Sequence, residues 1–76
     1  MTPDQVRIAL RELNGERDCT LGFAGLPEHE SHVTVHHAIL IPDESDHLVK
    51  LTDGKSVYII DAERVAWIRI SLKKFE

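Results

Sequence analysis

The sequence has 76 residues, with 9 basic and 13 acidic side chains and a formal net charge of −4. This length predicts one domain over residues 1–76, close to the lower limit for a self-sufficient core, so oligomerisation is an expected source of extra stability. A single cysteine excludes an internal disulfide and fits a reducing compartment. No apolar run reaches the ~20 residues of a membrane span. Because the N-terminus also lacks the pattern of a secretory signal, we expect a cytoplasmic protein.

A helix is predicted over about residues 3–13. Thr2 and Gln5 have the spacing of a capping box, in which each side chain bonds the other residue's backbone N–H. Asn14-Gly15 supplies a stop signal at the end of this segment. The apolar residues between these signals recur at spacings of four and three, and they are Val6, Leu10 and Leu13.

The rest of the chain has the period-two pattern of β-strands. The longest strand would span ~33 Å if it were straight, so in a domain this small we expect it to bend around residues 36–38. Asp53-Gly54 predicts a tight hairpin turn, and Asp61 is the expected cap of a single helical turn. The five predicted strands lie at about 19–24, 32–41, 47–52, 56–60 and 65–72.

These elements predict a mainly β fold with an N-terminal α-helix. A flat sheet of five strands in so few residues could not bury both of its faces, and it would leave open edges. Rolling the strands into a five-stranded small barrel, Sm-like or SH3-like, solves both problems.

The order of elements is similar to that of the Sm-like small-barrel family. Residues 39–51 resemble its first motif, a hydrophobic strand followed by a turn and a second apolar strand, and residues 57–68 resemble its second motif. The resemblance implies a non-enzymatic module that assembles into a homo-oligomer such as a ring. In this family the fourth strand of one subunit pairs with the fifth strand of the next, and RNA binds at the turn of the first motif and the loop of the second.

Carried over to this chain, the resemblance implies two sets of residues. The implied RNA-binding residues are Asp43, Ser45, His47 and Asp61. The implied oligomer interface consists of Val57, Tyr58, Ile59, Ile60, Val65, Trp67 and Arg69. Because aspartates would face phosphate with like charge, a protein-interaction or regulatory barrel without nucleic acid is the alternative.

A third hypothesis is a metal-binding module. His29 and His32 have loop-compatible spacing beside acidic residues, and zinc accepts imidazole and carboxylate ligands. Other histidines do not extend this set, because His36 is too far along the strand from His32 and neighbouring side chains on a strand point to opposite faces. The competing interpretation is surface histidines on a half-exposed strand.

The sequence carries no catalytic signature. Asp43, Glu44 and Asp46 form a cluster that is typical of a turn. Cys19 has no identifiable base, and the scattered glycines form no phosphate-binding loop. We therefore expect neither an enzyme nor a cofactor, and the partners left open are a second copy of the chain, RNA or another protein, with no membrane.

Overall fold

The chain begins with α1 (Pro3–Leu10), whose first turn is closed by a reciprocal pair of hydrogen bonds. The structure is a computed structural model, and it describes residues 1–25, 27, 31–42 and 48–72. The backbone N–H of Gln5 donates to the Thr2 hydroxyl at 3.1 Å, and the Thr2 N–H donates to Gln5 Oε1 at 3.0 Å. The capping box therefore forms as its spacing predicts.

The helix ends at Leu10, before the position that the apolar stripe indicates. Tertiary pairing explains the early end. Asn14 forms an isolated β-bridge with Ile39, and the Gly15 N–H donates to the carbonyl of Ala38 at 3.0 Å. These bonds draw the backbone away from the helix axis, although the side chain of Leu13 stays buried.

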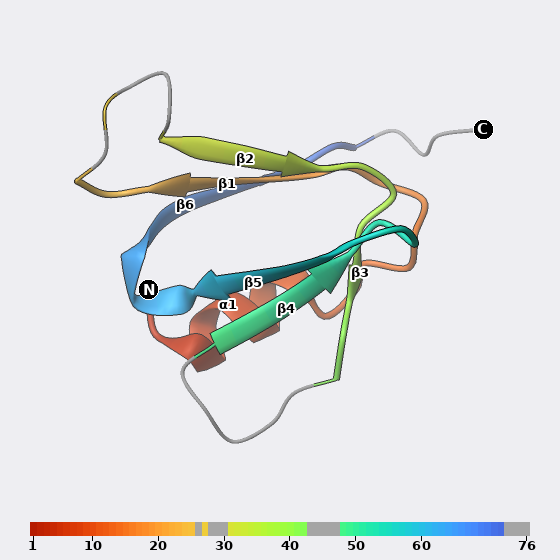
Figure 1. Cartoon of the computed structure of the whole chain (residues 1–76). Helices are drawn as coiled ribbons and strands as arrows, with labels where there is room; N and C mark the ends of the chain where they lie inside the picture. Colours follow the sequence, from red (N-terminus) through yellow and green to blue (C-terminus); the bar gives the residue numbers. More distant parts are fainter. Residues whose placement is uncertain (26, 28–30, 43–47, 73–76) are drawn as a thin grey trace.

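In the described residues six strand segments follow, and they form two antiparallel sheets of three strands each. One sheet has the order β2-β1-β6 and the other has the order β3-β4-β5 (Figure 1). The helix α1 packs against β4 and the short 3₁₀ helix η2 (Ala62–Arg64). The strands are β1 (Cys19–Phe23), β2 (His32–Val35), β3 (Ile39–Leu40), β4 (Leu48–Thr52), β5 (Val57–Asp61) and β6 (Val65–Ile70).

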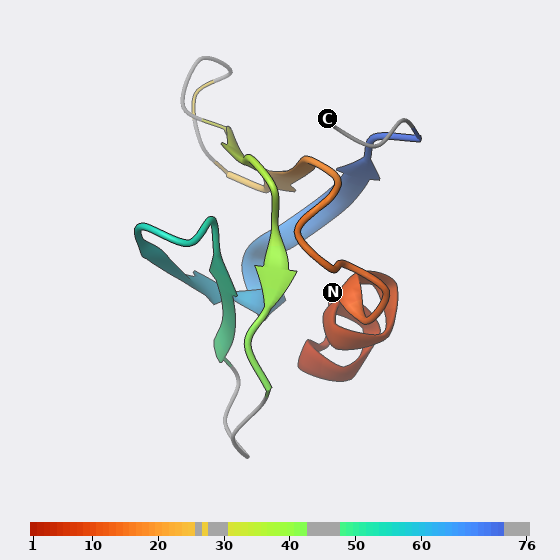
Figure 2. The same ribbon diagram turned by 90° about the vertical axis from the view of Figure 1, so that its right-hand side faces the viewer.

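The long strand expected at 32–41 is divided in two by a turn at residues 36–38. Its first part, β2, belongs to one sheet and its second part, β3, belongs to the other, so this segment links the sheets (Figure 2). His37 takes a positive φ of 50° at the bend, while Ala38 is fully buried. The bend therefore lies at residues 36–38, the position at which it was expected.

The core lies between the two sheets and is covered on one side by α1. It combines side chains from the helix and from both sheets, so the three layers fold as one unit. Its largest fully buried members are Val6, Leu10, Cys19, Leu21, Val35, Val49, Leu51 and Val65.

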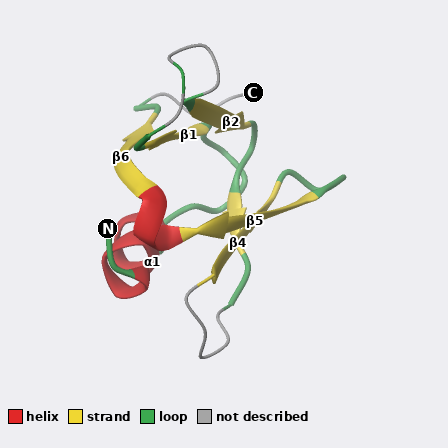
Figure 3. Cartoon of the chain, turned by 60° about the vertical axis from the view of Figure 1, so that its left-hand side comes forward, coloured by secondary structure: helices red, strands yellow, loops and turns green. Residues whose placement is uncertain are grey.

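The structure confirms a mainly β fold with one N-terminal helix, but the described strands form two sheets rather than one closed barrel. In the described residues, β5 pairs only with β4, and β6 pairs only with β1. The helix η2 stands between β5 and β6 and carries the chain from one sheet to the other (Figure 3). Asp61 caps η2 by accepting a hydrogen bond from the N–H of Glu63 at 3.1 Å.

No helix among the described residues is long and apolar enough to cross a membrane.

Candidate functional site

Three of the four residues implied in RNA binding, Asp43, Ser45 and His47, lie outside the described residues. The fourth, Asp61, is at the end of β5. Its carboxylate caps η2 and lies 3.8 Å from Nε of Arg64. The side chain of Asp61 therefore has a structural role in turning the chain from β5 into β6.

Of the two histidines in the metal hypothesis, the structure describes one. His29 lies outside the described residues, and His32 is an exposed residue at the start of β2. In the described ranges, no group of three or more His, Cys, Asp or Glu side chains could hold a metal ion.

Some side chains of the implied interface are exposed to solvent, and others are buried in the core. Val57 and Ile59 on β5 are 55% and 61% exposed, which is unusual for β-branched side chains in a small domain. Ile60 and Val65 face the core, so only their backbone is available to a second copy. The two remaining members on β6, Trp67 and Arg69, are exposed on the other sheet.

Tyr58, the last member of the implied interface, takes part in the β4–β5 hairpin. Its hydroxyl donates to Oδ2 of Asp53 at 3.1 Å, and the other carboxylate oxygen of Asp53 accepts from the N–H groups of Lys55 and Ser56 at 2.8 Å. The hydrogen bond with Asp53 and the negative charge of that carboxylate raise the pKa of Tyr58. The backbone hydrogen bonds from Ser56 and Lys55 are the main reason that the pKa of Asp53 is lowered. Tyr58 therefore stabilises the turn that presents β5.

Each sheet has two outer strands in the described part of the chain, β2 and β6 in one and β3 and β5 in the other, and the implied interface lies at β5 and β6. β5 is the last strand of its sheet and exposes one backbone edge together with Val57 and Ile59. β6 is the last strand of the other sheet, and the carbonyl at its first residue, Val65, accepts a hydrogen bond from the N-terminal ammonium of Met1 at 2.7 Å. Unpaired backbone edges bearing apolar side chains are ready templates for another strand.

Asp18 forms the centre of a polar cluster at the bend between β2 and β3. Its Oδ2 lies 2.9 Å from Nδ1 of His36, and its Oδ1 accepts from the backbone N–H of His37 at 3.2 Å. The Nδ1 of His37 lies 3.1 Å from the carbonyl of Gly15. The carboxylate therefore holds together two segments that are far apart in the sequence.

The ionisation of Asp18 follows from these contacts. Partial burial by itself would raise its pKa, but the hydrogen bonds from the His36 ring and the His37 backbone, with the charges of both imidazoles, outweigh it. The net result is a lowered pKa, so the carboxylate form is favoured. Sequence reasoning did not single out Asp18, because only the fold brings residue 18 beside residues 36 and 37.

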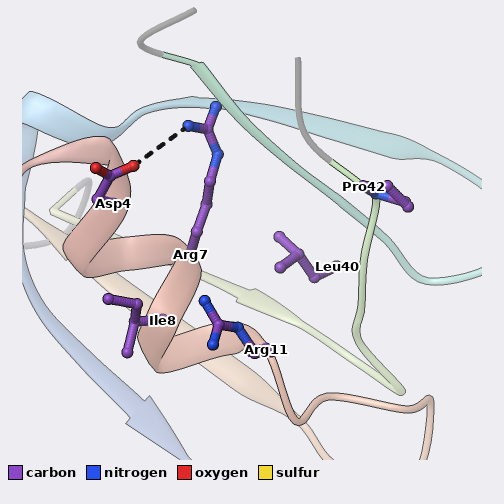
Figure 4. A pocket seen from close by; sticks show the side chains of 6 residues that line it. All are labelled: Asp4, Arg7, Ile8, Arg11, Leu40 and Pro42. Carbon is purple, nitrogen blue, oxygen red and sulfur yellow. Dashed lines mark ion pairs between the residues drawn. The ribbon is translucent and has the colours of Figure 1, made fainter. Parts of the chain in front are cut away.

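A cleft of about 390 Å³ separates α1 from β3 (Figure 4). Arg7 donates to the carbonyl of Leu48 at 3.0 Å and lies 3.9 Å from the Asp4 carboxylate, so it also ties α1 to β4. One turn later, Arg11 is exposed at the cleft. The lining residues are Asp4, Arg7, Ile8, Arg11, Leu40 and Pro42. Basic and apolar groups thus share one opening.

Cys19 is fully buried in β1. Burial raises the pKa of its thiol to about 11. Because the thiolate is the nucleophilic form, this side chain acts as a small core residue at neutral pH.

Comparisons with family models, with curated proteins and with solved structures gave no match.

Proposed function

We propose that this protein is a small non-catalytic, Sm-like binding module that assembles with copies of itself through the open edges of β5 and β6. The observation that carries the proposal is the edge of β5 that is unpaired among the described residues, with its two solvent-exposed β-branched side chains, Val57 and Ile59. Pairing this edge with a strand of a second copy would satisfy its backbone groups and remove apolar surface from water.

The topology supports a head-to-tail arrangement. β5 and β6 are consecutive in the chain but belong to different sheets. The β5 edge of one copy can therefore pair with the β6 edge of the next, which is a heterologous contact that closes into a ring when the rotation permits. The bent β2–β3 strand and the one-turn η2 before β6 are also the features on which the Sm-like resemblance rests, and a closed barrel is the form we propose for the module within such an assembly.

The substitution Ile59→Lys tests the assembly. It places an ammonium group on the open edge of β5, where charged residues oppose strand addition. We expect the wild-type mass in solution to be a multiple of the 8.6 kDa chain. In the variant the association should weaken by about tenfold or more, as expected from the loss of a buried isoleucine. Sedimentation equilibrium measures both.

Ile8→Lys is the matched control, because Ile8 is 62% exposed on α1 and its change adds the same charge. It should keep the wild-type mass. A wild-type protein that is monomeric at all concentrations would refute the assembly, and equal behaviour of the two variants would place the interface away from β5.

RNA binding is the second candidate function, and the cleft between α1 and β3 favours it. Arg11 and Arg7 are one helical turn apart, and the apolar walls at Leu40 and Pro42 offer contact to bases (Figure 4). Such a site would combine phosphate contacts from arginine with stacking or apolar contact to the bases.

Fluorescence anisotropy with labelled oligo-U and oligo-A, titrated against salt, tests this function. RNA binding through arginine should weaken steeply as salt rises. At a given salt concentration, Arg11→Gln should lower the affinity for RNA. Arg64→Gln, which changes an exposed arginine of η2, should leave that affinity unchanged. No binding at low salt would leave the module with protein partners alone.

A further inference from the structure

The outer face of the β2-β1-β6 sheet forms a shallow trough that is separate from the open strand edges. Strand register places Gly22 opposite His32 and Trp67, and it places Thr20 opposite Thr34 and Arg69. At Gly22 the central strand thus has no side chain between two large ones, and at Thr20 it has a small side chain beside Arg69. A cleft of about 370 Å³ lies here, lined by Asp18, Thr20, Thr34, Arg69, Ile70 and Ser71.

At one end of the trough Trp67 supplies a flat aromatic surface. A Cβ atom placed on Gly22 would lie 2.0 Å from Cε2 of Trp67, so the indole lies directly on the backbone of β1. Trp67 is nevertheless 43% exposed. Glycine therefore permits the ring to lie flat on the strand, and a planar ligand can stack on the exposed indole surface.

The polar side chains beside this ring can donate hydrogen bonds. The guanidinium of Arg69 lies over the Trp67 ring, 5.9 Å from its centroid, and it forms no ion pair with another described residue. The hydroxyls of Thr20 and Thr34 are 2.9 Å apart, and Thr20 is only 4% exposed. Because one hydroxyl of this pair donates to the other, the second keeps a proton for a ligand.

The one carboxylate in the cleft, that of Asp18, has its oxygens occupied. They receive hydrogen bonds from the His36 ring and the His37 backbone. Asp18 directly precedes β1 and lies two residues from Thr20, which is ~7 Å, on the side away from Trp67. The available end of the trough therefore presents a cation, a hydroxyl donor and an aromatic surface together.

We propose that this trough binds a small planar anion, an aromatic ring that carries a phosphate or carboxylate group. The ring stacks on Trp67, the anionic group pairs with Arg69, and the Thr20–Thr34 pair donates the remaining hydrogen bond. Charge-assisted bonds from arginine to an oxyanion are stronger and more directional than neutral ones. One unpaired guanidinium matches one anionic group, whereas a polynucleotide needs a row of cations.

This inference goes beyond the proposed function and can be tested apart from it. Assembly uses the backbone edges and the side chains of β5, whereas the ligand would contact the outer face of β1 and β6. Binding is therefore measured on both the wild type and Ile59→Lys. If Ile59→Lys is monomeric and still binds the ligand, the two sites are independent.

Trp67 is the only tryptophan of the chain, so its fluorescence reports directly on this trough. The probes are AMP and UMP, their nucleosides, inorganic phosphate and benzoate, with N-acetyltryptophanamide as the correction for absorbed light. Calorimetry provides a second readout. We expect saturable quenching by a ring that carries an anion, with nucleoside alone or phosphate alone at least tenfold weaker. The nucleotides and benzoate distinguish a phosphate from a carboxylate ligand.

Two variants locate the site. Arg69→Gln should weaken binding about tenfold to a hundredfold, with partial recovery in Arg69→Lys, because it removes a charge-assisted contact. Gly22→Ala should displace the indole and abolish the stacking contribution, so that the remaining affinity falls to that of phosphate alone. Arg64→Gln removes the same charge at η2 and should bind as the wild type does.

Three results would overturn the proposal. The first is the absence of saturable binding of every ring-bearing anion at millimolar concentration. The second is binding that Arg69→Gln and Arg64→Gln affect equally. The third is oligo-U or oligo-A binding in the trough far more tightly than UMP or AMP with a steep salt dependence, which would assign the site to a polymer.

Discussion

Asp18 shows how one charged side chain fixes a bend in the backbone. The carboxylate bonds both residues that precede Ala38 in the turn, while the Ala38 N–H donates to the carbonyl of Arg17 at 2.9 Å. The turn that sends β2 into one sheet and β3 into the other is therefore held by the segment just before β1. Asparagine at this position would keep the shape of the side chain but would remove the negative charge.

We expect Asp18→Asn to destabilise the protein by about 1 kcal/mol near pH 5, since it weakens charge-assisted hydrogen bonds. The pKa of Asp18 is lowered by folding, so its contribution is fully present above the unfolded value of about 4. That contribution is lost as the pH falls through the lowered folded value, and the difference between variant and wild type should shrink at pH 3. Urea unfolding at both pH values measures it.

Glu12→Gln is the control for this measurement, because Glu12 is an exposed carboxylate and the change in charge is the same. It should stay within about 0.5 kcal/mol of the wild type at each pH. A constant difference between Asp18→Asn and the wild type from pH 5 to pH 3 would contradict the role given to the Asp18 charge.

At the scale of elements, α1 is a short helix whose stability depends on its ends and its packing. It has eight residues, fewer than an isolated helix needs in water. The capping box closes its first turn, while Val6 and Leu10 pack it into the core. Arg7 adds a hydrogen bond to the carbonyl of Leu48 at the start of β4. The helix thus forms because it is held at its N-terminus and on its buried face.

Thr2→Ala should lower the free energy of unfolding by about 1 kcal/mol, because it leaves the N–H of Gln5 without its acceptor. Thr2→Ser keeps the hydroxyl and should lose only a few tenths of a kcal/mol. Urea denaturation followed by circular dichroism compares the two. If alanine and serine had equal effects, the cap would contribute nothing to the stability of the fold.

At the scale of the whole molecule, the described part of this 76-residue chain has a single core that lies between two sheets and one helix. Among the described residues neither sheet is closed, and the outer strands, β5 and β6 among them, each pair with one strand of their own sheet. A domain of this size has a small margin of stability, so the loss of one core side chain affects a large part of it. The same limit gives self-association a physical advantage.

Leu51→Ala should destabilise the protein by about 2–5 kcal/mol, since Leu51 is fully buried on β4 and its removal leaves a cavity. Leu72→Ala makes the same chemical change at a residue that is 89% exposed, and its effect should be within about 0.5 kcal/mol. Thermal and urea unfolding compare them. A large effect of Leu72→Ala would reveal a contact made by the end of the chain in the assembled protein.

The sequence by itself determined the local elements of this fold. Thr2 and Gln5 specify a helix start through bonds within four residues, and Asp61 specifies the cap of η2 in the same way. Period-two alternation located the strands, and the length of residues 32–41 required the bend that His37 and Ala38 make. All of these signals act over a few residues, where side-chain chemistry alone selects the backbone conformation.

Tertiary structure decided what depends on distant segments. The helix stops at Leu10 because the following backbone pairs with β3, and no local signal foretells that partner. Val65 is buried although Trp67, two residues on, is exposed, because the register of β1 against β6 shifts between Gly22 and Phe23. The polar cluster at Asp18 and the trough beside Trp67 have the same origin. They exist only where segments meet in space, since a contact between distant residues leaves no period in the sequence.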